Sequence, residues 1–396
     1  IGTSAGDWTA DPQPLTLRAG VTSSVTLTFR KNSTLAVTAN FVNNVQSVGL
    51  GLGTSYVVTD GGLLESGLSS ATRTFTRMSF TAFDTTSVPT NAIAALAAGY
   101  DAACAARQDG TVWCWGQNHF GELGPAGTIG STSPTPLQVT GISAVTQIAA
   151  GAYHFCVIGK YGAATMPAVY CWGRGDRGQL GNGAMTSSAT PQQANVLSTV
   201  RSIACGGDST YLVDTTGAAF GWGYNGYGQL GDATTTSHSA PTAANRGLVQ
   251  SIAGGDGHSC GLRFDGIVSC VGQNADGQLG NGTTMNTGAS FAINGLVAKQ
   301  VATGGFSTCA ITTAGQTLCW GRGAEGEIGN GNSSGRTTPG PLAPDAPAFT
   351  SVAVGFQHAC GLTAASDLYC WGANANGQVG DGTVNYAFVP VKAQLQ

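Results

Sequence analysis

Cysteine pairs are the residues of this chain whose type and spacing point most directly to chemistry. Ten of the 11 cysteines fall into five pairs, four with a separation of ten positions and one with a separation of fifteen. Cysteines that recur at short, regular separations form either disulfides or metal sites. The pairs are Cys104/Cys114, Cys260/Cys270, Cys309/Cys319, Cys360/Cys370 and the longer Cys156/Cys171.

The segment between Cys104 and Cys114 has the pattern of a β-hairpin. Asp109-Gly110 lies midway between the two cysteines, and this dipeptide is typical of a hairpin turn. Residues equidistant from such a turn face each other with Cα atoms about 4.5–5.5 Å apart. That distance lies within the disulfide range of about 4.4–6.8 Å, so the spacing predicts a bond across each hairpin.

Two related segments without cysteines help to separate a disulfide from a metal site. Each lacks both members of the pair, as a bond between the two positions requires, and no histidine completes a zinc-finger spacing. We therefore predict five disulfides and no metal site. The residues at the vacant positions are Tyr211 and Gly221 in one segment, and Tyr56 and, within one residue, Ser66 in the other.

Each pair sits at the same place in a repeating unit of about fifty residues. An apolar run that ends in small residues opens the unit, the hairpin follows, and then comes a phrase such as Trp172–Gly181 (W-G-R-G-D-R-G-Q-L-G). Seven units rich in short β-runs and glycine predict an all-β chain folded as a closed β-propeller over 36–396. The predicted blades are 46–92, which is degenerate, and 93–145, 146–200, 201–249, 250–298, 299–349 and 350–396.

Residues 1–35 are surplus to this ring and predict an N-terminal β-arm. Val25, Leu27 and Phe29 alternate with polar residues, as in a half-buried strand, and Leu15 and Leu17 belong to the same arm. The arm either packs on its own propeller, or joins a neighbouring subunit or surface by strand addition, or is a disordered leader.

The phrase W-G-x-N-x-x-G-Q-L-G within such units resembles the repeat of the regulator of chromosome condensation family, over 46–396. The resemblance implies a seven-bladed propeller. Family members include a nuclear exchange factor for a small GTPase, a plant ultraviolet-B photoreceptor and secreted inhibitors of β-lactamases, so it implies the fold and no single function. Five tryptophans share one repeat position, which favours a structural role over a photoreceptor cluster; they are Trp115, Trp172, Trp222, Trp320 and Trp371.

The composition limits the kinds of partner that the protein can bind and the cellular compartments in which it is expected. Lys+Arg number 16 against 20 Asp+Glu, which gives a net charge of −4 and argues against nucleic-acid binding. We find no apolar run of about 18 residues, so no membrane insertion is predicted. Disulfides persist in oxidising compartments, and we expect a secreted or cell-surface protein.

The remaining reactive residues have structural interpretations. His154, His258 and His358 each lie two residues before a cysteine, and this repetition favours hydrogen bonding over catalysis or metal binding. Cys205 is predicted to be a free buried thiol, with an intermolecular bridge as the alternative. Loops such as 274–282 are similar to calcium loops but lack the closing Glu, so turns are predicted there. We find no catalytic motif and expect no catalytic residue and no cofactor.

These observations predict a non-catalytic propeller that serves as a structural or adhesive subunit and assembles with copies of itself through 1–35. The alternative is a soluble binding module or inhibitor that holds a partner protein on one face. An exchange factor for a small GTPase is the third possibility, and the predicted compartment argues against it. The candidate partner-face aromatics are Phe120, Tyr224, Tyr227 and Tyr386.

Overall fold

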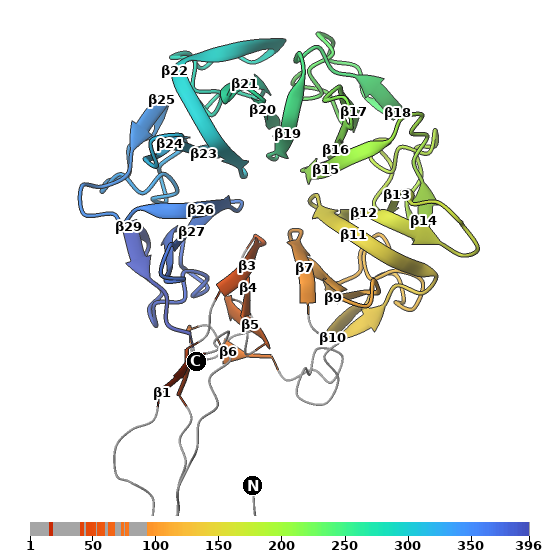
Figure 1. The fold of residues 1–396 in the computed structure, drawn as a ribbon, viewed down its shortest axis with the longest axis horizontal. Coiled ribbons are helices and arrows are strands. Elements are labelled where there is room, and N and C mark those ends of the chain that lie inside the picture. The colour runs from red at the N-terminus through yellow and green to blue at the C-terminus, as the bar shows by residue number, and fades with distance from the viewer. Residues whose placement is uncertain are drawn as a thin grey trace, which may run out of the picture.

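The computed structural model describes residues 16–18, 40–42, 45–52, 54–59, 62–67, 73–74, 76–78 and 93–395, and these residues form strands and turns without a helix. The strands make five four-stranded sheets, one seven-stranded sheet and one two-stranded sheet. The larger sheets stand in a ring around a central opening, with the first strand of each group nearest the centre (Figure 1). None of the described residues belongs to a helix long and apolar enough to cross a membrane.

The strands follow one another around the ring in chain order. The first two sheets contain β3 (Val45–Leu50), β4 (Thr54–Thr59), β5 (Gly62–Gly67) and β6 (Thr76–Arg77), then β7 (Ile93–Ala98), β8 (Ala102–Arg107), β9 (Val112–Gln117) and β10 (Thr132–Gln138). The next two contain β11 (Ile142–Ala150), β12 (His154–Tyr161), β13 (Ala168–Gly173) and β14 (Ser188–Gln193), then β15 (Val200–Gly206), β16 (Ser209–Asp214), β17 (Ala219–Gly223) and β18 (His238–Ala243).

The seven-stranded sheet contains β19 (Val249–Gly254), β20 (His258–Arg263), β21 (Ile267–Gly272), β22 (Thr287–Thr303), β23 (Ser307–Thr312), β24 (Thr317–Gly321) and β25 (Arg336–Pro341). The last sheet contains β26 (Phe349–Val354), β27 (His358–Thr363), β28 (Leu368–Gly372) and β29 (Ala387–Lys392). The first part of β22 pairs with β21 and its last part with β23. Two predicted units therefore share one strand, and the seven units correspond to six hydrogen-bonded sheets in the described part of the ring.

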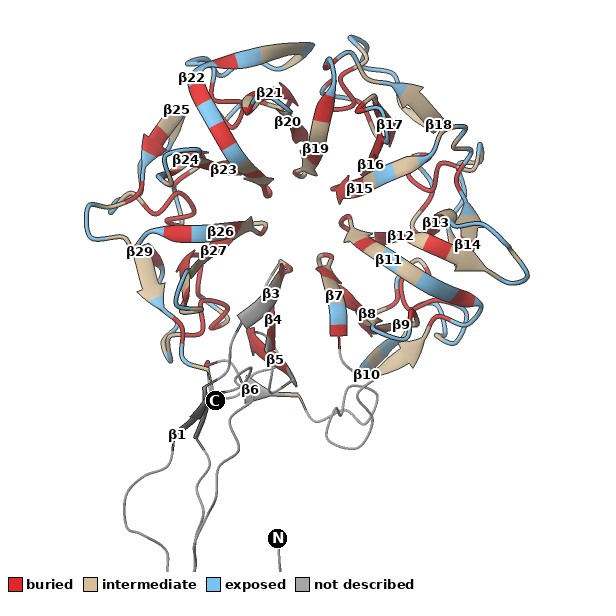
Figure 2. Cartoon of the chain, in the orientation of Figure 1, coloured by how far each residue is buried: buried red, intermediate tan, exposed pale blue. Residues whose placement is uncertain are grey.

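The hydrophobic core lies between neighbouring sheets, because each sheet turns apolar side chains towards both neighbours. One cluster joins Cys156 and Cys171 of one sheet, with Leu180 from the loop after β13, to Leu212 and Trp222 of the next sheet. Buried residues accordingly recur along the strands of the six sheets of the ring (Figure 2). The repeated tryptophans occupy these cores, and four are fully buried: Trp172, Trp222, Trp320 and Trp371.

The hairpin register places the two cysteines of every predicted pair directly opposite each other. All five pairs are joined as disulfides, with Sγ–Sγ distances between 2.06 and 2.12 Å. Their Cα atoms lie 4.0–4.1 Å apart, closer than the distance of about 4.5–5.5 Å expected from strand pairing alone. The disulfides are Cys104–Cys114, Cys156–Cys171, Cys260–Cys270, Cys309–Cys319 and Cys360–Cys370.

Two of these disulfides lie in the last two predicted units. The Cys309–Cys319 bond joins β23 to β24, and the Cys360–Cys370 bond joins β27 to β28. All four of these cysteines are buried, so both bonds lie within the hydrophobic core. The eleventh cysteine, Cys205, is also buried and is free.

The predicted arm lies largely outside the described residues, and this holds for Leu15, Val25, Leu27 and Phe29. Leu17 belongs to β1 (Thr16–Arg18), which pairs in parallel with β2 (Asn40–Val42) in the separate two-stranded sheet. The assignment of 1–35 to assembly therefore stays a prediction.

Candidate functional site

The strands of each sheet end at two different faces of the ring. One face carries the loops from the first to the second strand and from the third to the fourth, such as 151–153 and 174–187. We call it the connector face. The opposite face carries the turns between the second and third strands, such as 264–266, and we call it the hairpin face.

A repeated set of polar contacts fixes the connector loops. In the loop after β21, the Asn274 side chain accepts a hydrogen bond from the Leu279 N–H and donates to the Thr283 carbonyl. The Gln278 side chain accepts the Asp276 N–H in the same loop. These contacts explain the Asn and Gln of the loop without a calcium ion, and equivalent Asn contacts recur at Asn225 and Asn374.

The same loops are tied to the next sheet by buried tryptophans. The Trp222 indole N–H donates to the Gln179 carbonyl, and Trp320 and Trp371 donate in the same way to Gln278 and Glu327. The glycine after each tryptophan is also required: at Gly173, where φ is 97°, an added Cβ would lie 2.5 Å from the Tyr153 carbonyl oxygen. The repeat phrase therefore holds these connector loops against the neighbouring sheet.

The three repeated histidines bridge neighbouring sheets, in line with their predicted hydrogen-bonding role. Each Nε2 lies 2.8 Å from a hydroxyl of the next sheet, in the pairs His154–Thr210, His258–Thr308 and His358–Ser55. Burial lowers the pKa of His154 and His258 to about 3 and that of His358 to about 4. The three imidazoles are consequently neutral, and the last pair joins the final sheet to the first and so closes the ring.

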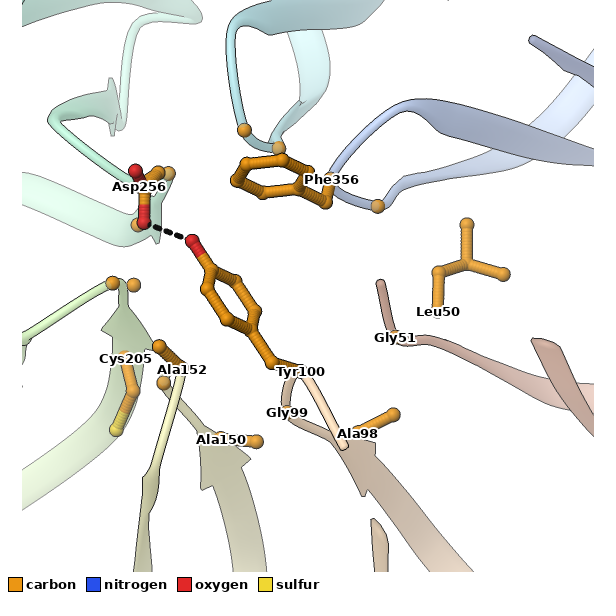
Figure 3. A pocket seen from close by; sticks show the side chains of 18 of the residues that line it. Leu50, Gly51, Ala98, Gly99, Tyr100, Ala150, Ala152, Cys205, Asp256 and Phe356 are labelled. Atoms are coloured by element: carbon orange, nitrogen blue, oxygen red, sulfur yellow. Dashed lines mark hydrogen bonds between the residues drawn. The ribbon is translucent and has the colours of Figure 1, made fainter. Parts of the chain in front are cut away.

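The central opening is narrow and lined mostly by small residues. It holds a cavity of about 100 Å³ bordered by glycines and alanines from the first strands. Backbone hydrogen bonds run around it from sheet to sheet, for example from Tyr100 N to the Ala152 carbonyl and from Ala152 N to the Gly207 carbonyl. Tyr100 reaches across the opening, and its hydroxyl donates to Asp256 at 2.5 Å (Figure 3).

Five aromatic rings form one continuous network on the connector face. Ring centroids are 5.4 Å apart for Tyr100–Tyr153 and 5.0 Å for Tyr100–Phe356. The network continues from Tyr153 to Phe120 at 5.5 Å and from Phe356 to Phe306 at 5.2 Å. All four contacts are edge-to-face, a favourable aromatic geometry. We call these residues the connector-face cluster: Tyr100, Phe120, Tyr153, Phe306 and Phe356.

Arginines stand at both ends of this cluster and beside it. The guanidinium carbon of Arg174 lies 5.2 Å from the Phe120 centroid, and that of Arg322 lies 5.5 Å from Phe306. Arg177 lies 4.4 Å from the centroid of Tyr224, whose ring contacts Tyr227. Such distances fall within the range of cation–π attraction.

Carboxylates hold two of these arginines in place. Asp208 lies 3.3 Å from Arg174 and 3.4 Å from Arg177. Burial raises the pKa of Asp208, while the two arginines act to lower it. Burial likewise raises the pKa of Asp256, and the hydrogen bond from Tyr100 opposes that rise. The face thus combines ordered arginines with a rigid aromatic surface.

A second cavity adjoins the cluster where the cysteine pair is missing. It measures about 260 Å³, and Tyr56, Glu65, Met78, Tyr100 and Trp115 line it. Tyr56 and Glu65 are opposed in the hairpin at the positions that cysteines occupy elsewhere. Burial raises the pKa of Glu65 to about 7. A carboxyl group with a shifted pKa in a largely apolar cavity is a candidate ligand-binding feature.

The structure brings three of the four predicted partner-face aromatics to the connector face near the arginines: Phe120, Tyr224 and Tyr227. Tyr386 is 45% exposed and ends the connector loop that directly precedes the outer strand β29. Sequence reasoning missed the central rings Tyr100, Tyr153, Phe306 and Phe356. All four follow the small residues that open a unit, and a comparison of that position between units would have found them.

One described cluster could hold a metal ion by its residue types: His154, Cys156 and Cys205. Cys156 is bonded to Cys171 in the structure. The cluster is therefore not a metal site in this redox state.

Comparisons with known proteins agree with this architecture. Residues 20–360 match the family described as RCC1-like domain, and residues 349–378 match the regulator of chromosome condensation (RCC1) repeat. The mitochondrial RCC1 domain-containing protein RUG3 of Arabidopsis thaliana is 30% identical over 127 residues, which cover 32% of this chain and 27% of that protein. The ultraviolet-B receptor UVR8 of the same plant is 29% identical over 138 residues, covering 34% and 30%. These alignments span less than a third of either relative.

Solved structures share the fold. Prp20p of Saccharomyces cerevisiae, described with its binding to Gsp1p and histones, has a TM-score of 0.66 at 24% identity and covers 76% of this chain and 77% of its own. Human WBSCR16 has a TM-score of 0.65 at 19% identity, covering 98% and 90%. The ectodomain of the Physcomitrella patens receptor kinase CR4 has a TM-score of 0.53 at 18% identity, covering 84% and 75%.

Proposed function

The chain belongs to the RCC1-like domain family, and we propose that it is a non-catalytic binding propeller that holds a partner protein on its connector face. The connector-face cluster and its arginines are the observation that carries this proposal. Prp20p, described with its binding to Gsp1p and histones, makes protein binding a natural function to test on this fold.

The residue types on this face are those that contribute most to binding. Aromatic residues and arginine are enriched among the residues that dominate protein–protein affinity. Their side chains are already ordered here, because edge-to-face contacts fix the rings and Asp208 fixes Arg174 and Arg177. Ordered side chains lose little conformational entropy on binding, which favours affinity.

We propose an extracellular or cell-surface location for this binding. Five cysteine pairs at bonding distance suit an oxidising compartment. An analysis of free thiols under denaturing, non-reducing conditions tests this directly. We expect one free thiol per chain, at Cys205, whereas free thiols at most of the ten paired positions would contradict the location.

A photo-crosslinking amino acid in place of single exposed aromatics tests the partner face. Tyr227 represents the connector face, and Phe264, which is 54% exposed, represents the hairpin face. In the native environment of the full chain we expect the Tyr227 probe to capture one partner protein. Unlabelled wild-type protein should compete, and an Arg177→Ala/Tyr224→Ala variant should not. Capture of the same partner mainly through the Phe264 position would overturn the proposal.

The structural or adhesive role with self-assembly is the second candidate. It is supported by the alternating pattern at 25–29 and by β1, which belongs to a sheet separate from the ring. Deletion of 1–35 should leave a folded ring that no longer assembles, as measured by light scattering and electron microscopy. An unchanged assembly state would contradict this role and leave the connector-face proposal untouched.

A further inference from the structure

The boundary between the β11–β14 and β15–β18 sheets brings together the ligand atoms of His154, Cys156 and Cys205. These atoms all lie within 4.8 Å of one another, and all three residues are buried. We propose that this boundary is a redox-gated zinc site: closed while Cys156 is bonded to Cys171, and able to bind Zn²⁺ through His154, Cys156, Cys171 and Cys205 once that disulfide is reduced.

The ligand set is the kind that zinc prefers. Three cysteines and one histidine form a common tetrahedral zinc site, with metal–ligand distances of about 2.0–2.3 Å. The four residues come from β12, β13 and β15, which are rigid strands of adjacent sheets. A histidine ligand must be neutral, and His154 is fully buried between the two sheets. Its Nε2 contacts the Thr210 hydroxyl, which also lies 4.0 Å from the sulfurs of Cys156 and Cys205.

The chemistry balances with a dithiol as reductant. The dithiol is oxidised to its own disulfide and transfers two electrons and two protons, which convert the Cys156–Cys171 bond into two thiols. Zn²⁺ then binds three thiolates and one imidazole, and the three thiol protons pass to solvent. The metal would link β12 and β13 to β15. A disulfide within one sheet would thus be replaced by a metal link between two sheets.

One ligand of the proposed site borders the central cavity. Cys205 lines the wall of the central cavity, and its sulfur is turned away from Tyr100 and Asp256 (Figure 3). His154, Cys156 and Cys171 are not among the residues that line this cavity.

The same chain contains a matched boundary that lacks the third cysteine. There His258, Cys260 and Cys270 repeat the arrangement, and Thr303 stands at the position of Cys205. The strand register supports this match: Cys205 opposes Thr210, and Thr303 opposes Thr308. A single replacement at Thr303 should therefore build a second site.

The test counts zinc ions on the full chain by native mass spectrometry after anaerobic incubation with Zn²⁺ alone. Cys171→Ser opens the pair without a reductant and leaves three protein ligands. We expect one zinc ion on Cys171→Ser, and none on oxidised wild type or on Cys171→Ser/Cys205→Thr. Cys270→Ser/Thr303→Cys should also gain one ion, and Cys270→Ser alone should gain none.

A second measurement covers the case in which Cys171→Ser does not fold. Wild type and Cys205→Thr are reduced with a phosphine and titrated with Zn²⁺, and we expect wild type to bind one ion more and to gain in melting temperature. Equal zinc counts with and without Cys205, or no zinc on any opened variant, would overturn the proposal.

Discussion

The connector face and the hairpin face are built from the same strands, but their side chains are organised differently. On the connector face, rings from separate sheets form one network around the central opening. On the hairpin face, the described ring contacts are separate pairs, such as Arg107–Trp113 and Arg201–Phe264. The polar contacts there are mostly local, as where Asp109 accepts hydrogen bonds from Thr111.

The contacts that build the ring are therefore distinct from the residues that are available to bind a partner. Repeated Asn, Gln and Trp contacts hold several of the loops between third and fourth strands in similar positions, so the residues beside them are available to form a binding surface. The hairpin turns are short, and their Asp residues are used to close the turn. Substitutions on one side of this separation should leave the other side unchanged.

The largest loss of stability is expected from the removal of a disulfide, because the disulfides belong to the ring and not to the connector face. Cys260→Ala/Cys270→Ala opens a hairpin clamp with a separation of ten positions. The free energy of unfolding should fall by about 3 kcal/mol in urea titrations, because the unfolded chain regains the entropy of an open loop. Partner affinity should not change, and a parallel loss of affinity would show that the two functions are not separate.

The second largest effect is a loss of stability at acidic pH. Burial lowers the folded-state pKa of His258 from its ordinary 6.5 to about 3, so only the unfolded chain takes up this proton as the pH falls. The stabilisation is complete above pH 6.5 and is lost as the pH falls towards 3. At pH 5 the loss from this residue should be about 2 kcal/mol relative to pH 7.

His258→Gln should remove that part of the acid dependence when unfolding is measured at pH 7 and pH 5. Thr308→Ser is the matched control, because it keeps the hydroxyl that contacts His258 and serine stands at the equivalent Ser55. Equal acid dependence in His258→Gln and wild type would contradict the neutral, buried state of this imidazole.

A smaller effect is expected at the central opening. Tyr100→Phe removes the hydroxyl that donates to Asp256. The loss of a hydrogen bond to a carboxylate should lower the free energy of unfolding by about 1.5 kcal/mol at pH 7. The pKa of Asp256, followed by NMR, should rise further, because that hydrogen bond lowers it. Tyr227→Phe, at an exposed ring of the same face, is the control and should change neither quantity.

The recurring features of the fold could be predicted from the sequence. The cysteine pairs, the Trp-Gly phrase and the repeated histidines each occupy one position in successive units, so one hairpin pattern places them all. The β22 strand shows the limit of that reasoning. It runs through a unit boundary without a break, and the sheet count therefore differs from the unit count.

The candidate site was harder to predict because ring closure, and not local sequence, creates it. Tyr100 and Phe356 are far apart in the chain and meet only when the last sheet closes on the first. The histidine–threonine contacts could have been predicted from the sequence. Where a unit has His154 or His258, the next unit has Thr210 or Thr308 at the position that contacts it.

The affinity of the captured partner for two matched variants tests the central claim most directly. Arg177→Ala/Tyr224→Ala removes a cation–π pair from the connector face, and Arg201→Ala/Phe264→Ala removes one from the hairpin face. By titration calorimetry, we expect the connector-face variant to bind at least about tenfold more weakly, a loss of about 1.4 kcal/mol, and the hairpin-face variant to bind within about twofold of wild type. Equal losses in both variants, or a loss confined to the hairpin-face variant, would contradict the assignment of the connector face as the binding surface.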